Sequence, residues 1–131
     1  DGVQWTAPDA LFAQSDVVSL HCPWTPAAHH MVGARQFSVM KRSALLINTA
    51  RGALVDPVAL DGALRRGEIG GAALDVVSEE PLPEGSILLD TPKLLITPHV
   101  GWATLAARKR LMSTVLENIR SFFAGRPQNV V

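Results

Sequence analysis

Four short apolar runs recur along the chain, each followed closely by polar side chains. They read DVVSLHCP at residues 16–23, ALLINTA at 44–50, GAALDVV at 71–77 and KLLITPH at 93–99. Their apolar residues are continuous rather than alternating, which is typical of strands covered on both faces in a parallel sheet. The pattern therefore predicts four parallel strands with a packed layer on each side.

A helical pattern lies between the second and third of these runs. The segment DPVALDGALRRGEIGG offers Asp56 as an N-cap, Pro57 at the first helical position and Gly67 as a stop. The side of this helix that we expect to be buried comprises Val58, Leu60 and Leu64. A weaker helical pattern, GARQFSVMK, precedes the second run.

The last long segment of the chain also has helical spacing. Apolar residues recur every three or four positions between residues 104 and 124, and Gly125 and Pro127 follow. These apolar residues are Leu105, Leu111, Met112, Val115, Leu116, Ile119, Phe122 and Phe123. Alternating strands and helices with short connections indicate an α/β fold. The sequence therefore predicts a doubly wound parallel sheet followed by a long C-terminal helix.

The composition narrows the classes of function. With 131 residues, 47% of them hydrophobic, the chain has the size of one domain and can bury a real core. Twelve basic and twelve acidic residues cancel, so the chain lacks the positive field that nucleic acid or an acidic membrane attracts. No apolar run approaches the ~20 residues of a membrane span. A single cysteine, Cys22, and the lack of a signal-peptide pattern favour a cytoplasmic protein.

Polar groups end each predicted strand, and parallel sheets bind ligands at the carboxyl ends of their strands. These groups are His21 and Cys22 after the first run, Thr49 and Arg51 after the second, Asp75 in the third, and Thr97 and His99 in the fourth. We therefore expect a binding site at this edge of the sheet.

Three ionisable residues indicate what this site does. Arg51 follows the second strand, Glu80 lies in the loop VVSEEPLPEG, and His99 ends the fourth strand. Each has a simpler interpretation when taken alone: a solvated arginine, a turn before a proline, or a hydrogen-bonded core histidine. At a shared ligand-binding edge, the three together indicate an active site.

The chemistry that these side chains suit is the reduction of a 2-keto acid. The guanidinium of Arg51 offers a planar set of donors that fits a carboxylate and can polarise the adjacent carbonyl. The imidazole of His99 can supply the proton that the developing alkoxide needs while hydride reaches the carbon. A neighbouring carboxylate, here Glu80, favours the protonated imidazole.

Several longer stretches carry a resemblance to a known family. LHCPWTPAAHHMV, MKRSALLINTARGALVD, GAALDVVSEEPLP and TPHVGWAT occur in this order, and the tail reads LENIRSFFAGRPQNVV. From about residue 15 to residue 131, the chain resembles the D-isomer-specific 2-hydroxyacid dehydrogenases. The form TPHVGWAT looks most like the glycerate dehydrogenases, also called hydroxypyruvate reductases. The resemblance implies a Rossmann-type NAD-binding domain and hydride transfer between a nicotinamide cofactor and a 2-keto or 2-hydroxy acid, such as hydroxypyruvate or glyoxylate.

The resemblance also implies roles for individual residues. Arg51 looks like the substrate-binding arginine, His99 like the acid and base, and Glu80 like the partner of that histidine. Glutamate rather than glutamine at this position speaks against the formate dehydrogenase branch. The cofactor contacts that the resemblance implies are Cys22, Thr49, Ala50, Arg51, Asp75, His99 and Gly101. The cofactor is NAD or NADP, no metal is implied, and the full-length subunit is expected to form a homodimer.

The chain departs from the family pattern in two places. Arg42 and Ser43 stand where the family usually has Pro-Gly, which is expected to alter one turn. The glycine-rich turn that holds the pyrophosphate, the acidic residue that follows it and the substrate domain have no counterpart in this sequence. We therefore expect residues 1–103 to be the C-terminal portion of the dinucleotide-binding domain. Residues 104–131 would form the C-terminal helix and a return segment toward the substrate domain.

A chain of this kind is predicted to be inactive by itself, because half of the cofactor's cradle is missing. It would also expose a sheet edge that some partner surface should cover. Two other classes of function remain open at this stage. One is a dehydrogenase-like corepressor in which nucleotide binding governs assembly with protein partners. The other is a non-catalytic interaction module.

Other polar and aromatic residues receive simpler interpretations. Cys22 is expected to be packed and inert rather than a nucleophile. His29 and His30 are expected to lie in a surface loop rather than bind a metal. Trp102 either shapes the substrate pocket or packs. Trp5 and Trp24 are interpreted as core or interface residues.

Overall fold

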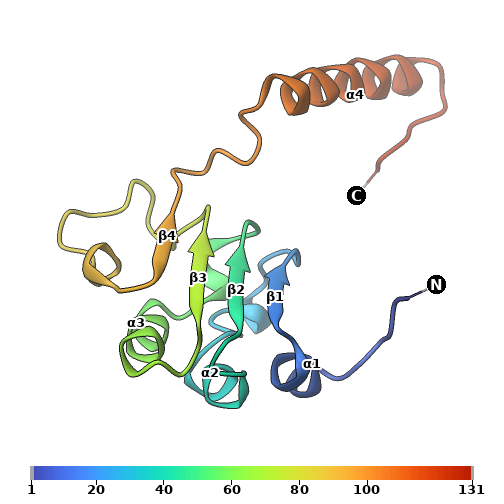
Figure 1. Cartoon of the computed structure of the whole chain (residues 1–131). Helices are drawn as coiled ribbons and strands as arrows, with labels where there is room; N and C mark the ends of the chain where they lie inside the picture. The colour runs from blue at the N-terminus through green and yellow to red at the C-terminus, as the bar shows by residue number, and fades with distance from the viewer. Residues whose placement is uncertain (1, 131) are drawn as a thin grey trace. The chain divides into compact units, whose positions relative to one another are not determined.

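The computed structural model describes residues 2–130, which form two compact units (Figure 1). The first extends to His99 and the second begins at Val100. The α-helices and strands of the first unit are α1 (Pro8–Gln14), β1 (Val17–Leu20), α2 (Ala34–Val39), β2 (Leu45–Asn48), α3 (Pro57–Arg66), β3 (Gly71–Leu74) and β4 (Leu94–Ile96). Its 3₁₀ helices are η1 (Pro26–Ala28), η2 (Gly52–Leu54) and η3 (Ile87–Asp90). The second unit contains α4 (Leu105–Phe123).

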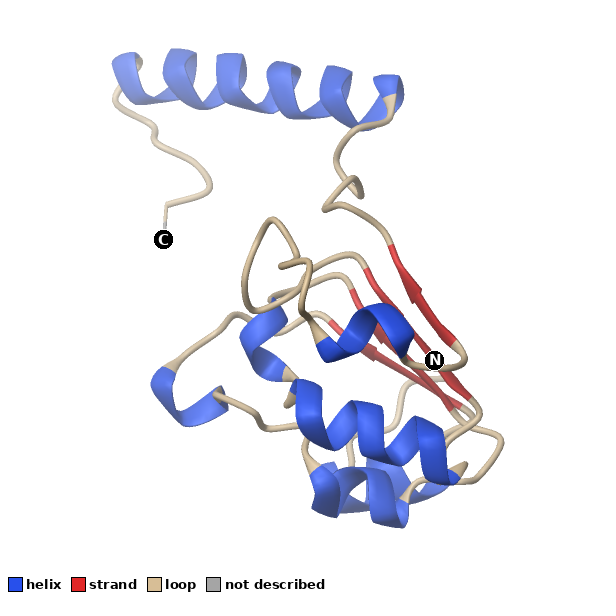
Figure 2. Ribbon diagram, turned by 90° about the vertical axis from the view of Figure 1, so that its left-hand side faces the viewer, coloured by secondary structure: helices blue, strands red, loops and turns tan. Residues whose placement is uncertain are grey.

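The four strands form one parallel sheet in the order β1-β2-β3-β4. Asn48 at the end of β2 lies beside Leu20 of β1 and Leu74 of β3, so these three strands end together. Each strand is added on the same side of the previous one, and right-handed crossovers then place every connecting helix on one face. Figure 2 shows the helices of this unit gathered on that face.

The helix-covered face of the sheet forms the core. Its side chains alternate with outward-facing ones along β1 and β2, where Val18 and Leu46 are at most 3% exposed. Phe12 of α1, Phe37 of α2 and Leu60 of α3 pack in the same cluster. The burial of these three helix faces anchors the layer, since each large apolar side chain contributes about 1.5–3 kcal/mol when fully buried.

The opposite face differs from the prediction that both faces are covered. Val17, Leu45 and Leu95 are 51%, 44% and 63% exposed. The apolar runs are continuous because both faces of the strands are apolar, but the helices of this unit lie on only one of them. The prediction of an α/β parallel sheet is confirmed, and the expectation of two covered faces is wrong for this unit.

Local signals place α3 where the sequence predicts it. The Asp56 side chain accepts hydrogen bonds from the amides of Val58 and Ala59, at 2.9 and 3.1 Å. Gly67 ends the helix with a φ of 65°, in the left-handed region that glycine adopts at little cost. Leu60 and Leu64 are buried as predicted. Val58, also expected to be buried, is 69% exposed, and Ala63 is buried instead.

Two other features of the first unit differ from the sequence prediction. The regular strands are shorter than the apolar runs, because the last residues of each run form the turns at the sheet edge. Helix α1 was not predicted: it has Pro8 near its start, but its N-cap, Ala7, makes no side-chain hydrogen bond. Trp5, expected in the core or an interface, is 95% exposed.

The second unit consists of α4 and its flanking segments. The Thr104 hydroxyl caps the helix by accepting a hydrogen bond from the Ala107 amide at 3.2 Å, and Gly125 follows the helix with a φ of 71°. The predicted C-terminal helix is therefore confirmed. None of its residues is buried, and its apolar side chains are exposed. Among residues 2–130, no helix is both long and apolar enough to cross a membrane.

Candidate active site

A direct hydrogen bond joins His99 and Glu80. His99 Nδ1 lies 2.8 Å from Glu80 Oε2, and both side chains are partly exposed, at 47% and 39%. His99 follows β4 with a φ of 55°, which is uncommon for a residue other than glycine. Strained backbone of this kind is concentrated at functional sites.

Glu80 is held from two sides. Its Oε2 faces the His99 ring, and its Oε1 accepts a hydrogen bond from the Val77 amide at 3.1 Å. These contacts, the bond to His99 first, lower the pKa of the Glu80 carboxyl, although the charge on Asp75 and partial burial oppose them. Glu80 is therefore ionised at neutral pH and can orient the imidazole.

Arg51 lies in the turn that follows β2. Its Nη1 donates a hydrogen bond to the carbonyl of Ala50 at 2.6 Å, and the residue is exposed. The remaining donors of the guanidinium fork are available for a planar anion. Arg51 thus stands in the turn at the carboxyl end of β2, and its role in binding a substrate remains a prediction.

One cleft of about 610 Å³ brings these residues together. It is lined by Pro23, Trp24, Arg51, Gly52, Ala53, Val76, Val77, Ser78, Glu80 and His99. The expectation that the guanidinium, the carboxylate and the imidazole gather around one site agrees with this arrangement. Their individual roles remain predictions.

Gly52 allows the turn that carries Arg51 to approach the loop that carries Glu80. A Cβ atom on Gly52 would lie 2.0 Å from the carbonyl carbon of Val77 and 2.4 Å from the amide nitrogen of Ser78. No side chain can occupy such a space without displacing backbone. The close approach is therefore part of how the cleft is built.

The predicted cofactor residues lie around the carboxyl ends of the strands. The Thr97 hydroxyl donates a hydrogen bond to Asp75 Oδ1, and Asp75 is 9% exposed. Asp75 and Thr97 line a second cavity of about 760 Å³ that also includes Glu80 and His99. Buried Asp75 and half-buried Thr97 fit the nicotinamide end of a dinucleotide, whereas the sequence contains no glycine-rich turn for its pyrophosphate.

The other predicted cofactor residues do not line the cavity that contains Asp75 and Thr97. Cys22 follows β1, is partly buried and contacts Met31, with Sγ 3.8 Å from Sδ. Thr49 and Ala50 form the turn after β2. Gly101 belongs to the second unit, as does Trp102, so the predictions for both remain open.

The sequence interpretation missed two features of the site. Trp24, interpreted as a core or interface residue, is 45% exposed and lines the cleft with Arg51 and His99. Asn48 is fully buried at the end of β2. The sequence analysis treated it only as part of the apolar run ALLINTA. Trp24 lies in the segment that follows β1 and Asn48 is the last residue of β2, so the expectation of a site at the carboxyl ends of the strands could have drawn attention to both.

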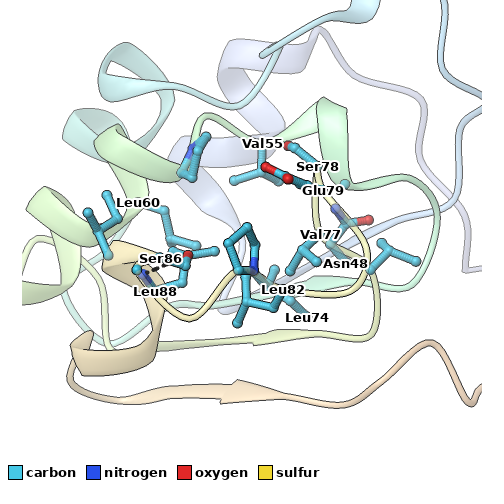
Figure 3. A pocket seen from close by; sticks show the side chains of 16 residues that line it. Asn48, Val55, Leu60, Leu74, Val77, Ser78, Glu79, Leu82, Ser86 and Leu88 are labelled. Atoms are coloured by element: carbon cyan, nitrogen blue, oxygen red, sulfur yellow. Dashed lines mark hydrogen bonds between the residues drawn. The ribbon is translucent and has the colours of Figure 1, made fainter.

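A third cavity of about 360 Å³ is lined in part by Val77, Ser78 and Glu79 of the loop that carries Glu80 (Figure 3). It is mainly apolar, with Leu60, Leu74 and Leu82 around it, and Asn48 and Gly52 also line it. This cavity therefore borders both the turn that carries Arg51 and the loop that carries Glu80.

The adjacent histidines His29 and His30 lie outside the cleft. The rings of His29 and His30 stack with centroids 3.9 Å apart, and His30 Nδ1 lies 4.0 Å from Asp56 Oδ2. Within the part of the chain that the structure describes, no group of three or more His, Cys, Asp or Glu residues could hold a metal ion.

The lowered pKa of Glu80 predicts acid sensitivity. Its pKa in the folded chain is below the ordinary value of 4.5, so its contribution to stability is present above that pH and is lost as the pH falls through the folded pKa. We expect the free energy of unfolding, measured with urea, to fall more between pH 5.5 and pH 3 in the wild type than in Glu80→Gln.

Glu79→Gln is the matched control for this prediction, because it removes a neighbouring carboxylate and keeps the pair of Glu80 and His99. It should follow the wild-type pH profile. A Glu80→Gln profile that coincides with the wild type would show that the pair adds nothing to stability. Because both side chains are more than a third exposed, the difference is expected to be small and to decrease with salt.

Comparison with known proteins identifies the family of the chain. The family described as "D-isomer specific 2-hydroxyacid dehydrogenase, NAD binding domain" matches residues 1–101. The chain is 52% identical over 125 residues to a glycerate dehydrogenase of Methylorubrum extorquens, covering 94% of this chain and 40% of that protein. It is 42% identical to a glyoxylate reductase of Korarchaeum cryptofilum, covering 99% of this chain and 40% of that protein.

A solved structure agrees with these relatives. A D-isomer specific 2-hydroxyacid dehydrogenase from Lactobacillus delbrueckii, in its NAD-complexed form, matches with a TM-score of 0.79 and 36% identity, over 94% of this chain and 41% of that one. The chain thus spans about 40% of the length of these relatives. By its matched domain, its fold and its sequence, the chain belongs to the D-isomer specific 2-hydroxyacid dehydrogenase family.

Proposed function

We propose that this chain is the C-terminal part of an NAD- or NADP-dependent 2-hydroxyacid dehydrogenase. The reaction is hydride transfer between a nicotinamide cofactor and a 2-keto or 2-hydroxy acid, such as hydroxypyruvate and glycerate or glyoxylate and glycolate. The observation that carries this proposal is one cleft lined by Arg51, Glu80 and His99, with His99 Nδ1 bonded to Glu80 Oε2 at 2.8 Å. The names of the relatives support the choice of substrates.

The hydrogen bond to Glu80 assigns the two nitrogens of the His99 ring. A carboxylate accepts, so Nδ1 donates to Glu80, and we assign the proton transfer with the substrate to Nε2. When the ring is protonated, Nε2 gives its proton to the carbonyl oxygen of the keto acid as that oxygen gains negative charge. The neutral ring that remains keeps its Nδ1 proton and its bond to Glu80. In the reverse direction, the same Nε2 takes the proton from the hydroxyl group.

Arg51 binds the other end of the substrate. Its guanidinium matches a carboxylate with parallel hydrogen bonds and places the adjacent carbonyl between itself and His99. The bound nicotinamide supplies the hydride in reduction, and Asp75 and Thr97 are the residues that would hold its polar edge. Arg51 and His99 therefore fix the orientation of the keto acid while the carbon is reduced.

The test of this proposal compares the chain alone with a complete subunit. In a chimera, this chain replaces the matched segment of the Methylorubrum extorquens glycerate dehydrogenase. We expect the chimera to oxidise NADH or NADPH with hydroxypyruvate or glyoxylate, and the isolated chain to show no turnover. A folded chimera without turnover on a panel of 2-keto acids would overturn the proposal. Ordinary turnover by the isolated chain would contradict its predicted inactivity.

We further propose that the complete subunit is a cytoplasmic homodimer that binds neither nucleic acid nor membrane. The single cysteine of this chain supports a cytoplasmic location. Its balanced charge supports the absence of nucleic-acid and membrane binding. Exposed apolar side chains along α4, among them Leu116, Ile119 and Phe123, are consistent with a covered position in a larger assembly.

A further inference from the structure

Asn48 is a buried amide at the end of an otherwise apolar strand. Its exposed fraction is 0%, and it lies beside Leu20 and Leu74 in the sheet. A polar side chain in this position costs free energy unless hydrogen bonds satisfy both ends of the amide. Both ends are satisfied. The partners of the amide therefore indicate why an asparagine stands here.

The two partners of the Asn48 side chain belong to the turn that carries Arg51. Nδ2 donates to the carbonyl oxygen of Arg51 at 2.9 Å, and Oδ1 accepts from the amide of Ala50 at 3.0 Å. The main-chain carbonyl of Asn48 accepts from the Asp75 amide at 2.9 Å, which ties the same residue to β3. Asn48 thus joins the sheet to the turn at fixed positions.

The guanidinium of Arg51 depends on the geometry of this turn. Its Nη1 donates a hydrogen bond to the carbonyl oxygen of Ala50. The amide of the same residue, Ala50, donates to Asn48 Oδ1. The carbonyl on the other side of the Arg51 Cα is also held by Asn48. A rotation of either peptide would carry the guanidinium away from the cleft that it shares with His99.

We propose that Asn48 is a positioning residue for substrate binding: its buried amide fixes the turn of residues 49–51 so that Arg51 presents its guanidinium to the substrate's carboxylate. This inference rests on the function proposed above. It adds a residue that touches neither substrate nor cofactor but determines where the substrate-binding arginine stands. Figure 3 shows Asn48 among the side chains that line the third cavity.

A purely structural buried amide would behave differently. Its loss would lower the free energy of unfolding but leave the kinetic constants of the folded enzyme unchanged. Loss of a positioning residue raises the KM for the keto acid and lowers kcat, because a misplacement of about 1 Å can cost ~10²-fold in rate. The KM for the keto acid should rise more than the KM for the nicotinamide cofactor, because the carboxylate depends on the Arg51 guanidinium, whereas the cofactor has expected contacts outside this turn, Asp75 among them.

Two substitutions in the chimera separate the two ends of the amide. Asn48→Asp keeps an acceptor for the Ala50 amide but removes the donor to the Arg51 carbonyl, and Asn48→Leu removes both. We expect each to raise the KM for hydroxypyruvate by about 10-fold or more, with Arg51→Leu as the reference for complete loss of the contact. Thr91→Val is the matched control, because Thr91 is also a buried polar residue. Its hydroxyl bonds to Asp61 and to the Ile87 carbonyl, away from the turn of Arg51.

The outcomes distinguish this inference from the proposed function. A folded wild-type chimera without turnover would overturn the function. An active wild type with an unchanged keto-acid KM in the folded Asn48 variants would overturn the role of Asn48 alone. A rise in the KM of Thr91→Val equal to that of Asn48→Asp would also overturn it, because general loosening would then explain both.

A second measurement does not depend on turnover. In the isolated wild-type chain, the Ala50 amide should exchange its hydrogen slowly, because the buried Asn48 oxygen holds it. Exchange measured by NMR at the rate of an unprotected peptide would overturn the inference. Slow exchange supports it and is expected to be lost in Asn48→Leu.

Discussion

Replacing His99 by glutamine is expected to lower the turnover of the chimera by about 10²–10⁴-fold, the usual contribution of a general acid. Glutamine can still donate a hydrogen bond toward the substrate but cannot release a proton at neutral pH. The expected loss appears in kcat for both hydroxypyruvate reduction and glycerate oxidation, because the same ring nitrogen gives and takes the proton. The measurement is steady-state oxidation or reduction of the nicotinamide cofactor.

His29→Gln is the matched control, since His29 is an exposed histidine outside the cleft. It should keep wild-type kinetics. Glu80→Gln should lie between the two, because it keeps the shape of the contact with His99 but replaces the charged acceptor that orients the imidazole with a neutral amide. Normal keto-acid reduction by His99→Gln would remove His99 from the mechanism.

Local sequence signals determined how well each helix could be predicted. The start of α3 carries a capping Asp56 and a proline, and Gly67 marks its end, so a few residues predict the whole element. Helix α1 has Pro8 but no side-chain cap, and it is only seven residues long. Its position depends on the burial of Phe12 against the core, which is a tertiary contact that no local pattern reveals.

The strands illustrate a different limit. Continuous apolar runs predicted a parallel sheet, and the order β1-β2-β3-β4 confirms it. The same runs predicted cover on both faces, yet Val17 and Leu95 are more than half exposed. Hydrophobicity shows that a face is suited to burial. It does not show whether the elements that bury it belong to the same compact unit.

The active site was partly predictable because parallel strands end at one edge. Arg51 and His99 follow strand ends, and that topology is sufficient to expect them at one site. The supporting contacts were not predictable in the same way. Asn48 was hidden within an apolar run, and Gly52 matters through the approach of backbone to backbone, which no side-chain pattern records.

Gly52→Ala is expected to destabilise the chain by about 3 kcal/mol or more, at or above the upper end of the usual cost of overpacking. The added methyl group would lie 2.0 Å from the Val77 carbonyl carbon, where only displaced backbone can relieve the clash. The change should appear as a lower free energy of unfolding in urea for the isolated chain. Gly85→Ala is the matched control: a Cβ there meets nothing within 4 Å, and Gly85 lines the same third cavity.

The same substitution tests how the cleft is assembled. Relieving the clash requires the turn of Arg51 and the loop of residues 77–80 to move apart, and these segments contribute the guanidinium and the carboxylate partner of His99. A Gly52→Ala chimera that still folds should therefore bind keto acids weakly, whereas Gly85→Ala should match the wild type in both stability and KM. Equal stability of Gly52→Ala and wild type would contradict the close packing of these two segments. Normal KM with reduced stability would show instead that Arg51 reaches its substrate without this contact.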